Sequence, residues 1–310
     1  MKKIAFIFPG QGSQYVGMGQ ELYSAYPEVQ TVFQEADRIL GRSISGLCFQ
    51  GPEEVLKDTR NAQPAILTTS IAILKVLHNE GVSPDFLAGH SLGEYSALVA
   101  SGAIPFADGL KLVASRSRLM AEADPGQNGT MAAILGLDRQ TLTELLKEAS
   151  TEGQVEAANF NCPGQIVVSG SKNGMAKLQG LVTGKGGKVI PLVVSGPFHS
   201  SFMKKAADVF KTELEGIEWK NPSPEVVANV SARPVTREQL AESLYRQIFS
   251  AVLWEDTLNY LAGQGVNVFI EIGPGKVLSG LVKKTLKEVS IANCEDLGSI
   301  KKALAILGEV

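Results

Sequence analysis

The chain alternates between short apolar runs that favour β-strands and longer segments with helical patterns. Ile4–Phe8 is a compact run that ends at a Pro-Gly turn, and residues 86–88 form a second run of this kind. Between them, residues 63–79 are apolar on almost every side, which is typical of a helix buried within a domain. Helical patterns follow again at 94–101 and 106–123. This alternation predicts a parallel sheet covered by helices on both faces.

The pattern changes between residues 126 and 196. Here the segments predict the order βαββαβ of a ferredoxin-like unit, with strands at 131–137, 155–160, 165–169 and 188–194 and helices at 139–149 and 173–182. The α/β pattern then resumes, with helices at 200–214 and 277–286 and strands at 226–230 and 266–272. We therefore expect an α/β fold: a large α/β-hydrolase-like domain with a parallel sheet core (residues 1–125 and 197–310), and an inserted ferredoxin-like subdomain (126–196).

Composition narrows the class of protein. The 310 residues are 44% hydrophobic and 20% charged, and the net charge of −3 gives no footprint for nucleic acid. The three cysteines, Cys48, Cys162 and Cys294, are scattered and lack metal-ligand spacing, which favours a reducing compartment. The first apolar run is too short for an export signal, and no segment is long enough to span a bilayer. We expect a soluble, cytoplasmic protein without a metal.

Ser91 stands between two glycines, in the sequence Gly89-His90-Ser91-Leu92-Gly93, where a predicted strand meets a predicted helix. This setting is that of a nucleophile elbow, in which the glycines allow a tight turn and the serine hydroxyl is exposed at the helix start. An ordinary strand-to-helix turn, in which Ser91 caps the helix, explains the same sequence motif.

A serine nucleophile needs a base, and the chain has only three histidines. His78 lies on the apolar helix, which favours a structural role. His90 adjoins the serine, so at a sharp elbow its side chain should point away from the Ser91 hydroxyl. His199 follows the predicted insertion, in a loop that could present it. By elimination the pair is Ser91 and His199. In an α/β-hydrolase the histidine comes last in the triad and usually near the chain end, which weakens a hydrolase assignment.

Several motifs, in this order, resemble the malonyl-CoA:acyl carrier protein transacylases of bacterial type II fatty acid synthesis. The resemblance extends over residues 4–286 and rests on residues 10–14 (GQGSQ), 89–94 (GHSLGE), Arg116, 159–161 (NFN), 198–200 (FHS), Gln247 and 273–276 (GPGK). It implies a ping-pong transfer of malonyl from malonyl-CoA to holo-acyl carrier protein, with no cofactor. An alternative is a serine thioesterase or esterase that uses the same Ser-His pair, and a third is a non-catalytic binding module.

The resemblance also implies roles for individual residues. Ser91 would be the nucleophile, His199 the base, and the backbone amides of Gln11 and Leu92 the oxyanion hole. Arg116 would bind the malonyl carboxylate through its planar guanidinium. A main-chain carbonyl near Gln247 would orient the histidine. Further substrate-binding positions would be Met120, Asn159, Asn161, Phe198 and His90.

Ordinary structural explanations remain open for several of these positions. An arginine such as Arg116 is often a solvated helix residue, Met120 could be plain core, and asparagines beside a Pro-Gly pair are common in turns. Lys276, Lys283 and Lys284 could form a local basic surface for the acidic carrier protein, although a solvated helix face explains them as well. We expect a monomer.

Overall fold

The computed structural model describes residues 2–124, 126, 128–194 and 196–308. Its larger sheet has five parallel strands in the order β7-β2-β1-β8-β9. The strands are β1 (Ile4–Phe8), β2 (Phe86–Gly89), β7 (Glu225–Val227), β8 (Val268–Ile272) and β9 (Ser290–Cys294). β1 lies at the centre and pairs with β2 on one side and β8 on the other. The strand order therefore reverses direction at β1, which is where open α/β sheets form their binding crevices.

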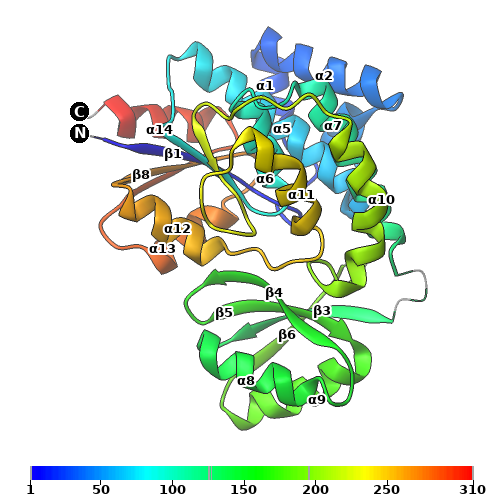
Figure 1. The fold of residues 1–310 in the computed structure, drawn as a ribbon. Coiled ribbons are helices and arrows are strands. Elements are labelled where there is room, and N and C mark those ends of the chain that lie inside the picture. The colour runs from blue at the N-terminus through cyan, green and yellow to red at the C-terminus, as the bar shows by residue number, and fades with distance from the viewer. Residues whose placement is uncertain (1, 125, 127, 195, 309–310) are drawn as a thin grey trace.

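Helices cover both faces of this sheet (Figure 1). Successive side chains of β1 point to opposite faces, so each face contributes to a different core cluster. Phe6 and Phe8 belong to the larger core cluster, whereas Ala5 and Ile7 pack in a second cluster. The helices of this domain are α1 (Gln20–Ala25), α2 (Pro27–Leu40), α3 (Ile44–Gln50), α4 (Glu53–Lys57), α5 (Thr59–Asn79), α6 (Gly93–Ala100), α7 (Phe106–Glu122), α10 (Lys204–Glu215), α11 (Leu240–Gln247), α12 (Trp254–Gly263), α13 (Val277–Thr285) and α14 (Leu297–Gly308). α12 and α13 supply the second cluster, and α5 lies buried within the first.

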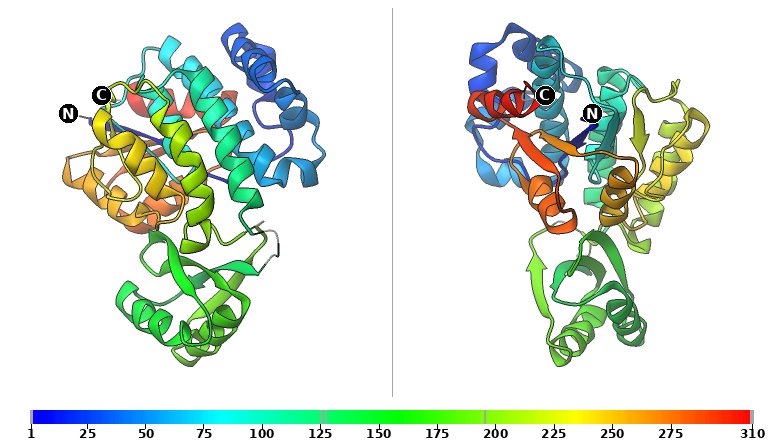
Figure 2. Two further views of the ribbon diagram at one scale, coloured as in Figure 1. Left: turned by 45° about the vertical axis from the view of Figure 1, so that its right-hand side comes forward. Right: turned by 90° about the vertical axis from the view of Figure 1, so that its left-hand side faces the viewer.

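A smaller sheet lies apart from the first, at the bottom of the molecule in Figures 1 and 2. Its order is β4-β5-β3-β6 and all its pairings are antiparallel. The strands are β3 (Gly129–Leu135), β4 (Val155–Cys162), β5 (Gln165–Ser171) and β6 (Lys188–Leu192), and they are covered by α8 (Arg139–Ala149) and α9 (Lys172–Gly184). The chain order is βαββαβ, as predicted, and the α/β fold class is confirmed. The limits of the subdomain at 126 and 196 stay a prediction.

The small sheet contacts the large domain through its edge strand β4, which pairs with the segment between α11 and α12. Val252 donates its amide to the carbonyl of Ala158, and Phe160 donates its amide to the carbonyl of Val252, each at 2.9 Å. Arg139 of α8 also forms an ion pair with Asp256 of α12, with 3.0 Å between Nη2 and Oδ2. These contacts hold β4 beside the large domain.

Several boundaries differ from the sequence prediction. β7 ends at Val227 rather than at residue 230, and the helix predicted for 200–214 begins as a 3-10 turn, Ser201–Met203, before α10. The pattern gave no prediction for α3, α4, β9 or α14. In the described part of the chain, no helix is both long enough and apolar enough to cross a membrane.

Candidate active site

Ser91 lies at a sharp turn between β2 and α6. Its φ of 54° is in the left-handed region, which non-glycine residues rarely adopt and which is common where strain serves function. The flanking glycines are required by space: a Cβ on Gly89 would lie 1.9 Å from the carbonyl oxygen of Gly93. A Cβ on Gly93 would lie 2.0 Å from the carbonyl oxygen of Phe8 in β1. The predicted elbow geometry is therefore present.

His199 faces the serine from the loop that follows β6. Its Nε2 lies 2.7 Å from Ser91 Oγ, and its Nδ1 lies 2.8 Å from the main-chain carbonyl oxygen of Gln247. A carbonyl only accepts, so Nδ1 carries the hydrogen and Nε2 is left to accept from the serine hydroxyl. His199 is buried and has a φ of 55°, so both members of the pair occupy strained backbone conformations.

The surroundings of His199 keep its ring neutral. Burial, and next the positive charge of Arg116, lower the pKa of His199 to about 3. The carbonyl of Gln247 has a smaller, opposing effect. The ring is consequently available as a base throughout the physiological pH range.

Arg116 comes from α7 and is wholly buried. Its Nη2 donates to Ser91 Oγ at 3.1 Å and to Gln247 Oε1 at 3.0 Å, and its Nη1 donates to Gln63 Oε1 at 2.6 Å. All three acceptors are neutral oxygens, so the guanidinium has no carboxylate in direct contact among the residues described. The exposed Arg118, by contrast, pairs with Glu122. A buried cation that lies 3.1 Å from Ser91 Oγ is therefore able to pair with an anionic group.

The two predicted oxyanion donors lie on adjoining turns. Leu92 is the N-cap of α6, and the first amides of a helix have no acceptor within the helix. Gln11 lies in the turn after β1, where a Cβ on Gly10 would come within 2.5 Å of the carbonyl oxygen of His90. The turn after β1 is thus packed against the elbow. The Gln11 side chain is anchored by its Nε2, which donates to Thr59 Oγ1 at 2.9 Å.

The remaining predicted residues surround the pair. His90 contacts Asn161 of β4, with 2.8 Å between Nε2 and Oδ1. Asn159, Phe198 and Met120 are buried nearby, and the Met120 sulfur lies 3.9 Å from Nε2 of Gln63. Phe198 precedes His199, and its carbonyl accepts from Ser169 of β5 at 2.5 Å. His90 is thus engaged by the small sheet rather than by Ser91.

Three polar residues of the site were missed by the sequence reasoning. Gln63 binds Arg116; Glu94 and Asn229, both wholly buried, contact the elbow and Gln247. The sequence held a signal for two of them: Gln63 is a polar residue on the largely apolar helix α5, and Asn229 lies just beyond the parallel strand β7. The role of the Gln247 side chain, as distinct from its carbonyl, was missed as well.

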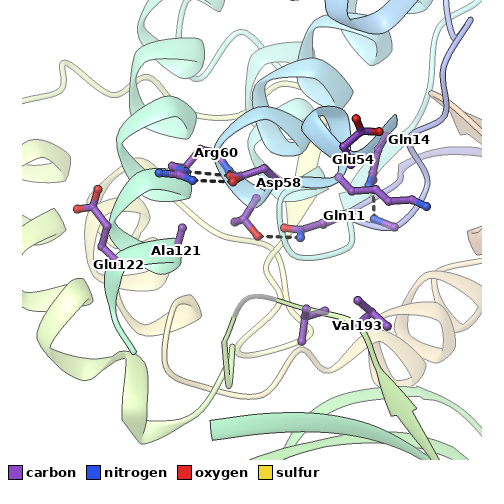
Figure 3. A pocket seen from close by; sticks show the side chains of 12 residues that line it. Gln11, Gln14, Glu54, Asp58, Arg60, Ala121, Glu122 and Val193 are labelled. Carbon is purple, nitrogen blue, oxygen red and sulfur yellow. Dashed lines mark hydrogen bonds and ion pairs between the residues drawn. The ribbon is translucent and has the colours of Figure 1, made fainter. Parts of the chain in front are cut away.

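Two cavities meet at the turn after β1, since both are lined by Gln11 and Gly12. The larger, of about 650 Å³, lies between that turn, the end of α7 and the segment after β6 (Figure 3). Ala121 and Val193 line it, and Asp58 and Arg60 form an ion pair in its wall. The smaller, of about 250 Å³, extends under the small sheet toward α13; its lining includes His90, Asn159, Asn161, Gln165, Val167, Leu192, Val277, Leu278 and Leu281. Both cavities therefore extend to the turn that contains Gln11.

A serine–histidine pair beside a buried arginine, at the strand ends of a parallel α/β sheet, is suited to acyl transfer through a covalent ester. Residues 5–306 match the acyl transferase domain family, and the chain belongs to it, among relatives that are named malonyl CoA-acyl carrier protein transacylase. It is an acyltransferase, and the resemblance noted in the sequence is confirmed.

The relatives match along almost their whole length. The malonyl CoA-acyl carrier protein transacylase of Bacillus subtilis is 48% identical over 100% of this chain and 98% of its own. The structure of the transacylase of that name from Clostridium perfringens has a TM-score of 0.96 and 42% identity, over 99% of this chain and 98% of its own. A malonyl-transacylase in complex with a type II PKS acyl-carrier protein has a TM-score of 0.96 and 41% identity, over 98% of this chain and 100% of its own.

Proposed function

We propose that this acyltransferase moves a malonyl group from malonyl-CoA to the phosphopantetheine thiol of holo-acyl carrier protein, by way of a malonyl ester on Ser91. One observation carries the choice of acyl group: the buried Arg116 guanidinium lies 3.1 Å from the Ser91 hydroxyl oxygen, and its acceptors within the described part of the chain are all neutral. A malonyl group has a free carboxylate that would pair with it, whereas an uncharged acyl group has none. The names of the relatives support the same substrate.

The first half-reaction begins when Ser91 Oγ attacks the thioester carbonyl carbon. His199 Nε2 takes the hydroxyl proton as the new C–O bond forms, and the amides of Leu92 and Gln11 bind the oxyanion. The intermediate then expels the CoA sulfur, which receives the proton from His199 and leaves as the thiol. The products are a malonyl ester on Ser91 and free CoA.

The second half-reaction is the reverse with a different thiol. His199 takes the proton of the phosphopantetheine thiol, the sulfur attacks the ester carbonyl, and Ser91 leaves with the proton returned by His199. Gln247 holds the base in the required tautomer by accepting from its Nδ1. Met120, Phe198, Asn159, Asn161 and His90 would shape the space around the acyl chain and the pantetheine arm.

Carrier protein would dock on the lysines at α13. Lys276, Lys283 and Lys284 are exposed, and Lys284 Nζ donates to Gln165 Oε1, at 3.0 Å, on the rim of the smaller cavity. An acidic partner bound there would have its thiol arm at the entrance of a passage that leads to Gln11. The complex of a related transacylase with an acyl-carrier protein supports a partner of this class.

Charge reversal tests this docking surface. The double change Lys283→Glu and Lys284→Glu should raise the KM for carrier protein at low salt and leave loading from malonyl-CoA unaltered. Lys301→Glu with Lys302→Glu, on exposed positions of α14, provides a control of equal charge. Equal carrier kinetics in the two double variants would place the docking surface elsewhere.

We further propose a monomer in the cytoplasm. All the residues assigned to the reaction come from one chain, and the three cysteines are buried and unpaired, which fits a reducing compartment. Light scattering after size-exclusion chromatography tests the monomer.

Radiolabelled malonyl-CoA tests the function directly. The wild-type protein should retain label and pass it to holo- but not to apo-carrier protein, and Ser91→Ala should retain none. Arg116→Ala should lose malonyl loading far more than acetyl loading. Release of free malonate, with no carrier product, would instead identify a hydrolase.

A further inference from the structure

Gln247 connects the base to the arginine. Its main-chain carbonyl accepts from His199 Nδ1 at 2.8 Å, and its side-chain Oε1 accepts from Arg116 Nη2 at 3.0 Å. One residue thus aims both the base and the cation at Ser91. Any rotation of the Gln247 side chain would displace Arg116, and any shift of its backbone would displace His199.

The orientation of the Gln247 amide is determined by what lies at each end. Arg116 only donates, so it requires the oxygen; at the other end Nε2 donates to Ser91 O and to Glu94 Oε2, each at 2.8 Å. Glu94 Oε2 also accepts from the amide of Asn229 at 3.1 Å. The Asn229 side chain in turn accepts from the Ser91 amide at 2.7 Å. The same carboxylate oxygen therefore supports Gln247 and the segment that holds the elbow.

Stability alone does not explain a glutamate at this position. Glu94 is 0% exposed, and its second oxygen, Oε1, has no hydrogen-bond partner among the residues that the structure describes. Burial raises the pKa of Glu94 to about 7, so the charged form is held at a cost. A buried carboxyl group with one unpaired oxygen weakens a fold, so a positional role for this side chain would account for its presence.

We propose that Glu94 is a positioning residue: through the Gln247 amide and the Asn229 backbone it fixes His199, Arg116 and Ser91 in one reactive geometry. This inference rests on the proposed function for the reaction that it serves. The position of Glu94 Oε2 is what matters, because Gln247 Nε2 and the Asn229 amide both donate to that oxygen. The charge itself is secondary, since a neutral side chain of the same length also offers an oxygen there.

Two conservative variants of Glu94 separate the effect of side-chain length from that of charge. Glu94→Gln keeps the length and an acceptor oxygen but loses the charge; Glu94→Asp keeps the charge but withdraws the carboxylate by one methylene. The first readout is the rate at which a fluorophosphonate labels Ser91, which needs the Ser-His pair but no malonyl group. The second is the kcat and KM of malonyl loading. Thermal unfolding is measured in parallel.

The matched control is Glu271→Gln. Glu271 is also wholly buried, with a pKa raised to about 7 by burial. Its oxygens accept from the amides of Leu278 and Ser279, at 3.0 and 2.7 Å, at the start of α13. This variant should lower the melting temperature and leave fluorophosphonate labelling unchanged.

Glu94→Asp should label and turn over roughly 100-fold more slowly, mainly in kcat, because a displacement of about 1 Å at a catalytic group has effects of that size. Glu94→Gln should stay within about threefold of wild type, since both hydrogen bonds at the acceptor remain. Rapid labelling of Glu94→Asp, or a slow Glu94→Gln beside a fast Glu94→Asp, would overturn the proposal.

If both variants are slow, a double-mutant cycle decides. Gln247→Met removes the amide through which Glu94 acts on Arg116 and His199 but leaves its contact with the Asn229 backbone, so adding Glu94→Asp should cause a clearly smaller loss than it does in the wild-type background. Losses that multiply would show that Glu94 acts independently of Gln247, and the inference would be wrong. Fluorophosphonate labelling without malonyl loading in the wild type would contradict the proposed function and leave this comparison intact.

Discussion

The surroundings of His199 predict an unusual pH dependence. For a histidine with the ordinary pKa of 6.5, about ten rings are charged for each neutral ring near pH 5.5. A reaction that needs the neutral ring therefore slows about tenfold when the pH is lowered from about 8 to about 5.5. In this site burial and Arg116 lower the pKa of His199 to about 3. The active, neutral form is lost only as the pH falls through that folded value. We therefore expect no decline between about pH 8 and about pH 5.5.

The assay is single-turnover loading of Ser91 from radiolabelled malonyl-CoA below saturation, because kcat/KM reports the free enzyme. Protonation of Glu94 in this range should have little effect, since Oε1 would carry the proton and Oε2 would keep both donors. A companion measurement uses fluorophosphonate labelling of Arg116→Met, in which the loss of the positive charge raises the pKa of His199. The decline with falling pH should then start closer to neutrality. A wild-type decline centred on the ordinary histidine value would refute the reasoning.

The elbow and its support make two further predictions. Gly93→Ala places a Cβ 2.0 Å from the carbonyl oxygen of Phe8, so it should abolish loading and lower the melting temperature. The control is Gly180→Ala, where the new Cβ lies in open space on α9. This variant should keep loading and gain about 0.5–1 kcal/mol of stability in urea unfolding. Asn229→Ala leaves the Ser91 amide without its acceptor. This change should lower the free energy of unfolding in urea by about 1–3 kcal/mol and slow the labelling of Ser91 by a fluorophosphonate. Full loading by Gly93→Ala, or undiminished stability of Asn229→Ala, would contradict these two arguments.

The contact between Ser91 and His199 was predictable because the signals for Ser91 are local in the sequence and the candidates for its partner are few. Ser91 lies in a run whose glycines, preceding strand and following helix all adjoin it in the sequence. His199 could be found by elimination, since the chain has so few histidines. The antiparallel unit could be read from the order of its segments, which the structure confirms. In each case the information needed is contained in one segment or in composition.

The polar support of the site was not predictable in the same way. Glu94 and Asn229 meet because β7 lies beside β2 in the sheet, and Gln247 arrives from the end of α11. The apolar pattern predicts strands but does not state which of them are neighbours. A buried glutamate in an elbow helix therefore looks like any polar residue of a first helical turn until the sheet order is known.

The strand β9 near the C-terminus was not predicted from the sequence for a different reason. β9 is a short edge strand, Ser290–Cys294, in which only Ala292 and Cys294 are buried, so its apolar signal is weak. Its neighbour β8, buried at every position, gave a clear one, although the predicted start at 266 was two residues early. Apolar periodicity reports burial, and edge elements have less of it.

The coupling between Arg116 and His199 bears on how the enzyme selects its acyl group. With nothing bound, the guanidinium donates to the Ser91 hydroxyl oxygen, and its charge disfavours the imidazolium that must form as the serine loses its proton. A malonyl carboxylate on Arg116 would offset that charge and make His199 a stronger base. An acetyl group has no carboxylate and would not offset that charge. Selection should then act on the chemical step as well as on binding.

Selection at the chemical step predicts a specific difference between malonyl-CoA and acetyl-CoA. Loading from acetyl-CoA should be slower in kcat and not merely weaker in KM, because saturation with acetyl-CoA leaves the base suppressed. Adding free malonate would not help, since it would compete for the space that the acyl group needs. In Arg116→Met the difference in kcat between the two substrates should nearly vanish. Equal kcat values in the wild type, with discrimination confined to KM, would show that Arg116 selects by binding alone.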